Sequence, residues 1–179
     1  TRLQEVVKAA GKVQNAEDRP PNRDLYLSHI NGLPVGDSRA QGVVRGSRFY
    51  HADLGITLAF PTGWIVDNQR TKVVAYTAAK DAVMAVSAEA PPPGMAPKEF
   101  LGRMLQGVTT TEAEPLQVNN LDGYRAVVRS MTLPWGNQGP ANVAVVYYNN
   151  LAYIFQGYTR QAAGLSSFEP VFLSSVKTF

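Results

Sequence analysis

The sequence predicts an α+β domain, built from a mostly antiparallel sheet covered by helices. From Val35 the pattern changes to short β segments, and in the segment 56–60 Ile56, Leu58 and Phe60 alternate with Thr57 and Ala59, which is typical of a half-buried strand. Two of these segments are separated only by Asn149-Asn150, a pair suited to the tight turn of an antiparallel hairpin. Two amphipathic helical segments need an apolar surface to cover, and the sheet supplies it.

The N-terminal region is predicted to form a helical arm and a linker. Apolar residues recur at helical spacing over residues 2–14, and the two prolines within residues 15–22 end that helix. A second short helix is expected over residues 23–29, because the Asn31-Gly32 pair that follows suits a left-handed helix C-cap. The first helix is thereby separated from the rest of the chain and is a candidate for pairing between copies.

A glycine-rich stretch follows the arm. Gly36, Gly42 and Gly46 interrupt the chain within eleven residues, so we expect a shaped connector here rather than a regular element. Beyond it the predicted strands come in quick succession, with a turn at residues 61–63. The segments expected to form strands are 56–60, 64–66, 72–77, 82–88, 116–119, 123–131, 141–148 and 151–158.

Two helices are predicted within the domain. The first follows a proline-rich stretch and has Pro97 in its first turn, where proline is favoured. Its apolar face consists of Phe100, Leu101, Met104, Leu105 and Val108. The C-terminal helix begins with Ser166 and Glu169 at the spacing of a capping box. Its apolar stripe consists of Phe168, Val171, Phe172, Val176 and Phe179.

Composition excludes several classes of protein. The chain has 179 residues, of which 45% are hydrophobic and 17% charged, which is too apolar for a disordered chain. No apolar run approaches the roughly 18 residues of a membrane span, and the absence of cysteine excludes disulfides and thiolate metal sites. The net charge of +3 lies within residues 1–48, but no Lys/Arg run there marks a nucleic-acid patch. We therefore expect a solvated surface and no nucleic-acid partner.

The search for chemistry gives no catalytic or metal-binding constellation. No HExxH motif occurs, and the two histidines, His29 and His51, lie too far apart to form a helical zinc pair. His51 and Asp53 have the spacing of one face of an extended segment, but a histidine that hydrogen-bonds a turn is the favoured interpretation. Glu112 and Glu114 are predicted to lie solvated in a threonine-rich loop. We therefore predict no catalytic, cofactor or metal residue in this chain.

Three residues are candidates for partner binding: Tyr50, His51 and Trp135. Trp135 lies in the Gly/Pro-rich segment LPWGNQGP, and aromatic residues on such loops serve as anchors for partners. Edge packing is the alternative interpretation of Trp135. Trp64, by contrast, follows a turn into a strand and is assigned to the core.

A series of motifs resembles the region after the catalytic domain in bacterial HExxH zinc metallopeptidases related to HtpX and the CAAX prenyl protease. The matching residues are Asp24, Tyr26, His29-Ile30-Asn31-Gly32-Leu33, Gly36-Asp37, Gln41-Gly42-Val43-Val44-Arg45-Gly46, Phe49, His51, Leu54, Phe60-Pro61, Gly63-Trp64 and Asn68. The family's zinc ligands and catalytic glutamate have no counterpart here, and Ala52 stands where the family usually has proline. The resemblance implies that residues 1–39 end a protease domain, which binds the zinc, and that residues 40–179 form its C-terminal accessory domain.

Residues 49–179 also resemble, at the level of fold, the layered domain of PsbP-like and Ran-binding Mog-like proteins. The segments that carry this resemblance are FPTGW, NNLDGYRAVV, YYNNLAYIF and SFEPVFLSSVKTF. Those proteins are mostly binding or assembly modules, and the likeness implies an antiparallel sheet between helices.

The expected function is that of a non-catalytic accessory domain of a periplasmic or cell-envelope zinc metallopeptidase. It would contact the upstream protease domain and a protein substrate or an envelope partner. The alternative is an independent PsbP-like module that binds a protein or a small ligand. A hydrolase that uses His51 is the least favoured hypothesis.

Overall fold

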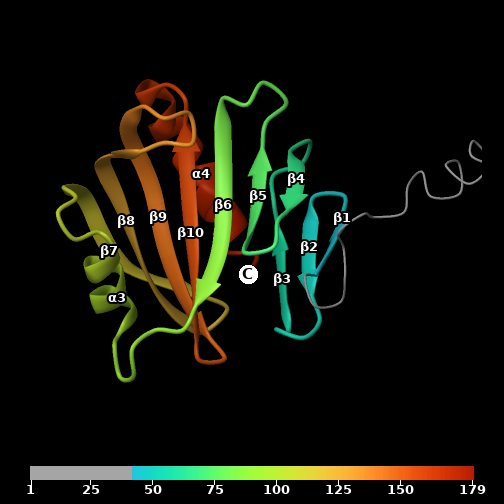
Figure 1. The fold of residues 1–179 in the computed structure, drawn as a ribbon, viewed down its shortest axis with the longest axis vertical. Helices are drawn as coiled ribbons and strands as arrows, with labels where there is room; N and C mark the ends of the chain where they lie inside the picture. Colours follow the sequence, from blue (N-terminus) through green and yellow to red (C-terminus); the bar gives the residue numbers. More distant parts are fainter. Residues whose placement is uncertain (1–41) are drawn as a thin grey trace, which may run out of the picture. The chain divides into compact units, whose positions relative to one another are not determined.

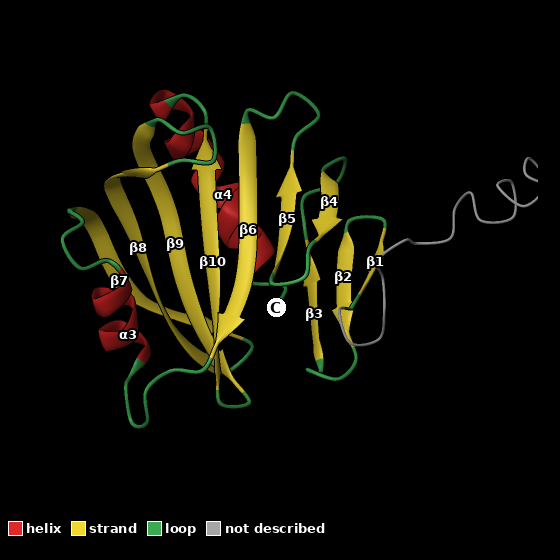
Figure 2. Ribbon diagram, in the orientation of Figure 1, coloured by secondary structure: helices red, strands yellow, loops and turns green. Residues whose placement is uncertain are grey.

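The computed structural model describes residues 42–179. Within this range the chain forms a seven-stranded and a three-stranded sheet, both antiparallel, together with two α-helices and one short 3-10 helix (Figures 1 and 2). The predicted α+β class is therefore confirmed. The predicted helical arm, its linker, its possible role in pairing copies and Gly36 lie outside the described residues.

The elements follow one another with short connections. The small sheet has the order β1-β2-β3 and the large sheet the order β4-β5-β6-β10-β9-β8-β7. In chain order the elements are β1 (Val43–Arg45), β2 (Arg48–His51), β3 (Ile56–Ala59), β4 (Ile65–Asn68), β5 (Lys72–Tyr76), β6 (Ala82–Glu89), α3 (Pro97–Met104), β7 (Thr110–Val118), β8 (Leu121–Thr132), β9 (Gln138–Tyr148), β10 (Leu151–Thr159), η2 (Ala162–Gly164) and α4 (Leu165–Val176).

Two hairpins of the large sheet turn on Asn-Asn pairs. Asn149 and Asn150 have φ values of 48° and 61° and join β9 to β10, which confirms the predicted two-residue turn, because both central residues of a type I′ turn have positive φ. Asn119 and Asn120, with φ values of 49° and 65°, join β7 to β8 in the same way. The sequence analysis missed this second turn, although the same Asn-Asn-Leu triplet marks it.

The large sheet has an apolar core on each face. Along β10, Tyr153 and Phe155 belong to the core beneath α4, whereas Ile154 and Tyr158 belong to the core on the α3 side. The alternation follows from the two-residue period of a strand. Helix α4 and the small sheet therefore share one face of the large sheet, with α4 behind the strands in Figure 1, and α3 packs on the other face.

The predicted connector is in part a regular hairpin. Residues 43–45, which lie within the stretch that we expected to be irregular, form β1, and the two-residue turn Gly46-Ser47 joins β1 to β2. Gly42 and Gly46 do adopt left-handed backbone angles, with φ values of 83° and 61°. A strand of three residues is too short to show alternation in the sequence, and this is why β1 escaped the analysis.

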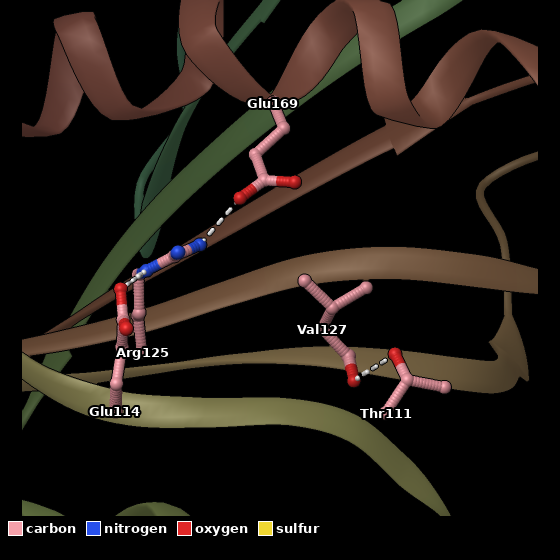
Figure 3. A network of polar contacts seen from close by, with 5 residues as sticks. All are labelled: Thr111, Glu114, Arg125, Val127 and Glu169. Atoms are coloured by element: carbon pink, nitrogen blue, oxygen red, sulfur yellow. Dashed lines mark hydrogen bonds and ion pairs between the residues drawn. The ribbon is translucent and has the colours of Figure 1, made fainter.

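Strand β7 is longer than predicted, and the threonine-rich loop assigned to its first half is wrong. Residues 110–115 pair with β8, and Glu114 lies opposite Arg125. Arg125 bridges two carboxylates: its Nε lies 2.7 Å from Glu114 Oε1 and its Nη1 2.5 Å from Glu169 Oε1 on α4 (Figure 3). Glu114 is thus an ion-pair partner on a strand, although its side chain remains 58% exposed.

The two helices differ in how well their ends were predicted. Pro97 is the first residue of α3, as expected, and Glu99 Oε2 accepts a hydrogen bond from the Ala96 amide. The predicted capping box of α4 is wrong, because this helix begins at Leu165 after η2 and has no side-chain cap. Glu169 pairs with Arg125 instead.

The predicted apolar stripe of the C-terminal helix is correct except at one residue. Phe168, Phe172 and Val176, spaced four residues apart, are buried against the sheet. Val171 lies on the flank of the helix and is 38% exposed. Phe179 lies beyond the end of α4 and is buried against Tyr153 and Phe155.

Candidate functional site

Within residues 42–179, several of the residues that carry the metallopeptidase resemblance contact one another around the small sheet. Asn68 Nδ2 donates a hydrogen bond to the carbonyl of Gly42 at 3.1 Å, which ties the end of β4 to the start of β1. A Cβ on Gly42 would lie 2.6 Å from the Phe49 ring, so only glycine fits here. The Phe60 amide donates to the Ser47 carbonyl at 2.8 Å. These residues thus hold the small sheet together and fasten it to the large one.

Trp64 belongs to the same junction. Its ring stacks on Phe168 of α4, with 5.7 Å between centroids and 10° between the planes. Trp64 packs against the core beneath α4, which confirms the prediction that it is a core residue.

His51 lies at the end of β2 and supports the turn that follows. Its Nδ1 accepts a hydrogen bond from the Leu54 amide at 3.3 Å, as predicted for a turn-binding histidine. Because Nδ1 is the acceptor, the neutral imidazole carries its proton on Nε2. The described residues form no hydrogen bond to Nε2, so the ring keeps one N–H donor for another group.

A cleft of about 300 Å³ lies where the two sheets meet, and His51 is one of its walls. We call it the inter-sheet cleft. Its apolar walls are Phe49, Leu54, Ile56, Val73 and Val86. Its polar residues include His51, Asn68, Arg70 and Tyr153, the last of which is 1% exposed and closes the floor. A concave, mostly apolar site with a few polar groups is the usual form of a binding pocket.

The electrostatics of the inter-sheet cleft favour an anion. Arg70 and Lys72 both line it, and none of the described residues that line it is acidic. Lys72 alternates with the inward-facing Val73 on β5, so its side chain starts toward the opposite face of the sheet. Arg70, in the exposed loop between β4 and β5, is therefore the principal cation of the cleft.

Tyr153 adds a protonated hydroxyl beneath the floor. Burial raises the pKa of this hydroxyl above its ordinary value, and Tyr148 adds to the effect. The hydroxyl has no hydrogen-bond partner among the described residues. It is thus a buried donor held close to the apolar part of the cleft.

Tyr50, the second predicted candidate, points away from the inter-sheet cleft. It follows Phe49 on β2, so its side chain lies on the outer face of the small sheet, where it is 42% exposed. There it lines a separate shallow depression with Val43, Arg45 and Ala52. Tyr50 and His51 are therefore neighbours in sequence that face different surroundings.

Trp135, the third candidate, lies in the connection between β8 and β9 and packs over the ends of the strands, against the β5–β6 connection and the residue that follows β10. Its Nε1 donates to the Lys80 carbonyl at 3.0 Å, and the Arg160 guanidinium lies 5.6 Å from the ring centroid. The ring is half-buried against the core on the α3 side. These contacts are consistent with the packing interpretation of Trp135, and its role in binding a partner stays a prediction.

Arg70 and Tyr153 were not predicted to belong to a site, yet both line the cleft. Tyr153 carried only a strand pattern, and Arg70 lies in a short polar turn. Nothing in either segment signals a site, since the cleft exists only because β2 and β3 meet the ends of β5 and β6.

Within residues 42–179 no three His, Cys, Asp or Glu side chains come together as a metal-binding group. None of the helices in this range has the length and hydropathy of a membrane span. Neither observation bears on residues 1–41.

Comparison with solved structures shows the fold. The chain is similar to the solution structure of CyanoP, the cyanobacterial PsbP of Synechocystis sp., with a TM-score of 0.53 and 15% identity over 81% of this chain and 97% of that one. It has a PsbP-like fold.

Two further structures align less closely. The Ran-binding protein Mog1p of Saccharomyces cerevisiae has a TM-score of 0.46 and 12% identity, over 68% of this chain and 82% of that chain. A Pseudomonas aeruginosa protein described as a putative regulator of unknown function has a TM-score of 0.46 and 11% identity, over 69% and 90% of the two chains. No family model and no curated protein sequence matches the chain. The PsbP-like likeness thus concerns the fold alone.

Proposed function

We propose that this chain is a non-catalytic accessory domain of a zinc-dependent metallopeptidase of the bacterial cell envelope. The zinc belongs to the upstream protease domain, and the domain described here binds a protein substrate or an envelope partner. The observation that carries the proposal is that motif residues within 42–179 meet at the small sheet, where Asn68 binds the Gly42 carbonyl and Gly42 packs closely against Phe49.

The contacts of the motif residues favour an architectural role over a chemical one. Gly42, Phe49 and Asn68 fasten one sheet to the other, and His51 Nδ1 is engaged by a backbone amide. A general base needs its basic nitrogen within reach of a substrate proton. A preformed cleft bordered by these residues suits binding instead.

The coding sequence upstream of residue 1 tests the proposal. We expect an in-frame domain with an HExxH motif. A signal peptide directly before residue 1 would contradict the proposal and favour the alternative, an independent PsbP-like binding module. That alternative is supported by the 97% of the CyanoP chain that the alignment covers.

A second experiment tests the accessory role in the full-length protein. Deleting residues 42–179 is expected to leave the zinc content and the cleavage of a short peptide unchanged, while cleavage of casein slows. Equal slowing of peptide and casein cleavage would show that the domain only supports folding of the protease. Hydrolase activity of this chain that is lost in His51→Ala would instead support the least favoured hypothesis.

A further inference from the structure

The geometry points to the inter-sheet cleft as a binding site for the C-terminus of a peptide, with a large apolar last residue in the cleft and its carboxylate held by His51 Nε2–H and Arg70. The inference deepens the proposed function by naming the chemical class of the partner. It rests on the proposed function only in assigning the peptide to a protein substrate or an envelope partner of the metallopeptidase.

The apolar part of the cleft suits one large side chain. Phe49, Ile56 and Val86 line it together with the ring of Tyr153, and its volume of about 300 Å³ lies at the lower end of the range for ligand pockets. A single leucine or phenylalanine side chain with its carboxylate therefore fits better than a large cofactor. Polar side chains would lose hydration without gaining a matched set of partners.

The polar part of the cleft suits a carboxylate. His51 has its proton on Nε2 because Nδ1 accepts the Leu54 amide, and Arg70 adds a guanidinium, the group that matches a carboxylate best. Among the described residues that line the cleft, Arg70 and Lys72 are basic and none is acidic, which favours an anion over a cation.

The border of the cleft favours a peptide over a free organic acid. Ile56 begins β3, which is an edge strand of the small sheet. Edge strands present backbone groups with which an extended chain can pair. At the far end of β3 the Ala59 amide already donates to Thr178 Oγ1 at 2.8 Å, so a peptide would meet β3 at its cleft end.

Fluorescence anisotropy of a labelled hexapeptide with the chain of residues 1–179 tests the inference. A peptide that ends in a free phenylalanine carboxylate is expected to bind at least about tenfold more tightly than the same peptide with a C-terminal amide, since a charged hydrogen-bond partner is lost. Replacing the last residue by aspartate should weaken binding by a similar factor. Equal binding of the acid and the amide would overturn the inference.

Three variants locate the site. Arg70→Gln is expected to weaken binding of the acid peptide about tenfold. Arg103→Gln, the same change at an exposed position of α3, should leave binding unchanged. His51→Asn keeps an acceptor for the Leu54 amide but removes the Nε2 donor, so it should weaken binding about tenfold without lowering the melting temperature. If Arg70→Gln and Arg103→Gln behave alike, the carboxylate does not bind in this cleft.

A competitor separates the peptide from a free acid. Octanoate should displace the labelled peptide only weakly, because it cannot pair with β3. Octanoate binding in the absence of peptide binding would overturn the inference in favour of a small-acid site. Failure of peptide binding together with slower casein cleavage after deletion of residues 42–179 would leave the accessory function standing and remove only the peptide site.

Discussion

The close approach of α4 to β10 predicts a large effect of one added methyl group. Gly157 lies on β10 beneath α4, and a Cβ at this position would lie 2.6 Å from Phe172 Cδ2 and 2.9 Å from Phe168 Cε1. Phe172 is 1% exposed and Phe168 6% exposed, so neither ring can swing into solvent. Gly157→Ala must therefore shift α4 or distort the core.

The cost follows from overpacking of a dense core. Inserting a methyl group into such a site typically costs about 1–3 kcal/mol, and two aromatic contacts below 3 Å place Gly157→Ala near about 2–3 kcal/mol. For a chain of this size we expect the melting temperature to fall by about 4–12 °C. Urea unfolding monitored by circular dichroism at 222 nm measures the same loss as a lower midpoint with an unchanged slope.

A matched glycine provides the control. Gly102 lies inside α3, and a Cβ there would meet nothing within 4 Å. Gly102→Ala should therefore stabilise the protein by about 0.5–1 kcal/mol, since alanine is the better helix former.

A second-site change tests the steric reason itself. Phe172→Leu in the Gly157→Ala background should cost less than the sum of the two single changes, because the smaller side chain leaves room for the methyl group. Unchanged stability of Gly157→Ala, or strict additivity of Gly157→Ala and Phe172→Leu, would refute the close contact of α4 with β10 at Gly157.

Three further predictions concern charge, backbone and pH. Glu169→Gln should destabilise the protein by about 1 kcal/mol in urea unfolding, and Glu114→Gln by less than about 0.5 kcal/mol. The reason is that the Glu169 side chain is 25% exposed and the Glu114 side chain 58% exposed. Equal losses of stability would contradict this ranking. Asn150→Val should lower the free energy of unfolding by about 1–2 kcal/mol, because the φ value of 61° is unfavourable for a β-branched residue. Asn150→Gly should leave the stability unchanged. Similar stabilities of the two variants would contradict the type I′ turn. Burial raises the pKa of Tyr158 from 10.0 to about 12. The stability that its neutral form contributes is therefore fully present below pH 10 and is lost as the pH rises toward 12. Tyr158→Phe should weaken this alkaline loss of stability in melting experiments, and an unchanged pH profile would contradict the prediction.

Most strands and both helices within residues 42–179 were predictable because their signals are local. The Asn-Asn turn after β9 and the position of Pro97 depend only on neighbours in sequence. The errors fall where a partner distant in sequence decides the structure. Residues 110–115 form a strand because β8 pairs with them, and Glu169 forms an ion pair because Arg125 lies opposite it, 44 residues away in the chain.

The candidate site was predictable only in part. His51 was correctly expected to bind a turn, and it was among the partner-binding candidates. Trp135 and Tyr50 were chosen for their residue type, and the structure places them away from the inter-sheet cleft. Arg70 and Tyr153 gave no signal at all.

By itself the sequence determines the α+β class and the two-residue turn at Asn149-Asn150, since backbone preference and side-chain period act over a few residues. Only the tertiary structure decides that Gly42, Phe49 and Asn68 are mutual partners. It alone creates the cleft beside His51, where β2 and β3 meet the large sheet. The reason is physical: a binding site requires groups brought together by packing, and packing depends on the whole chain.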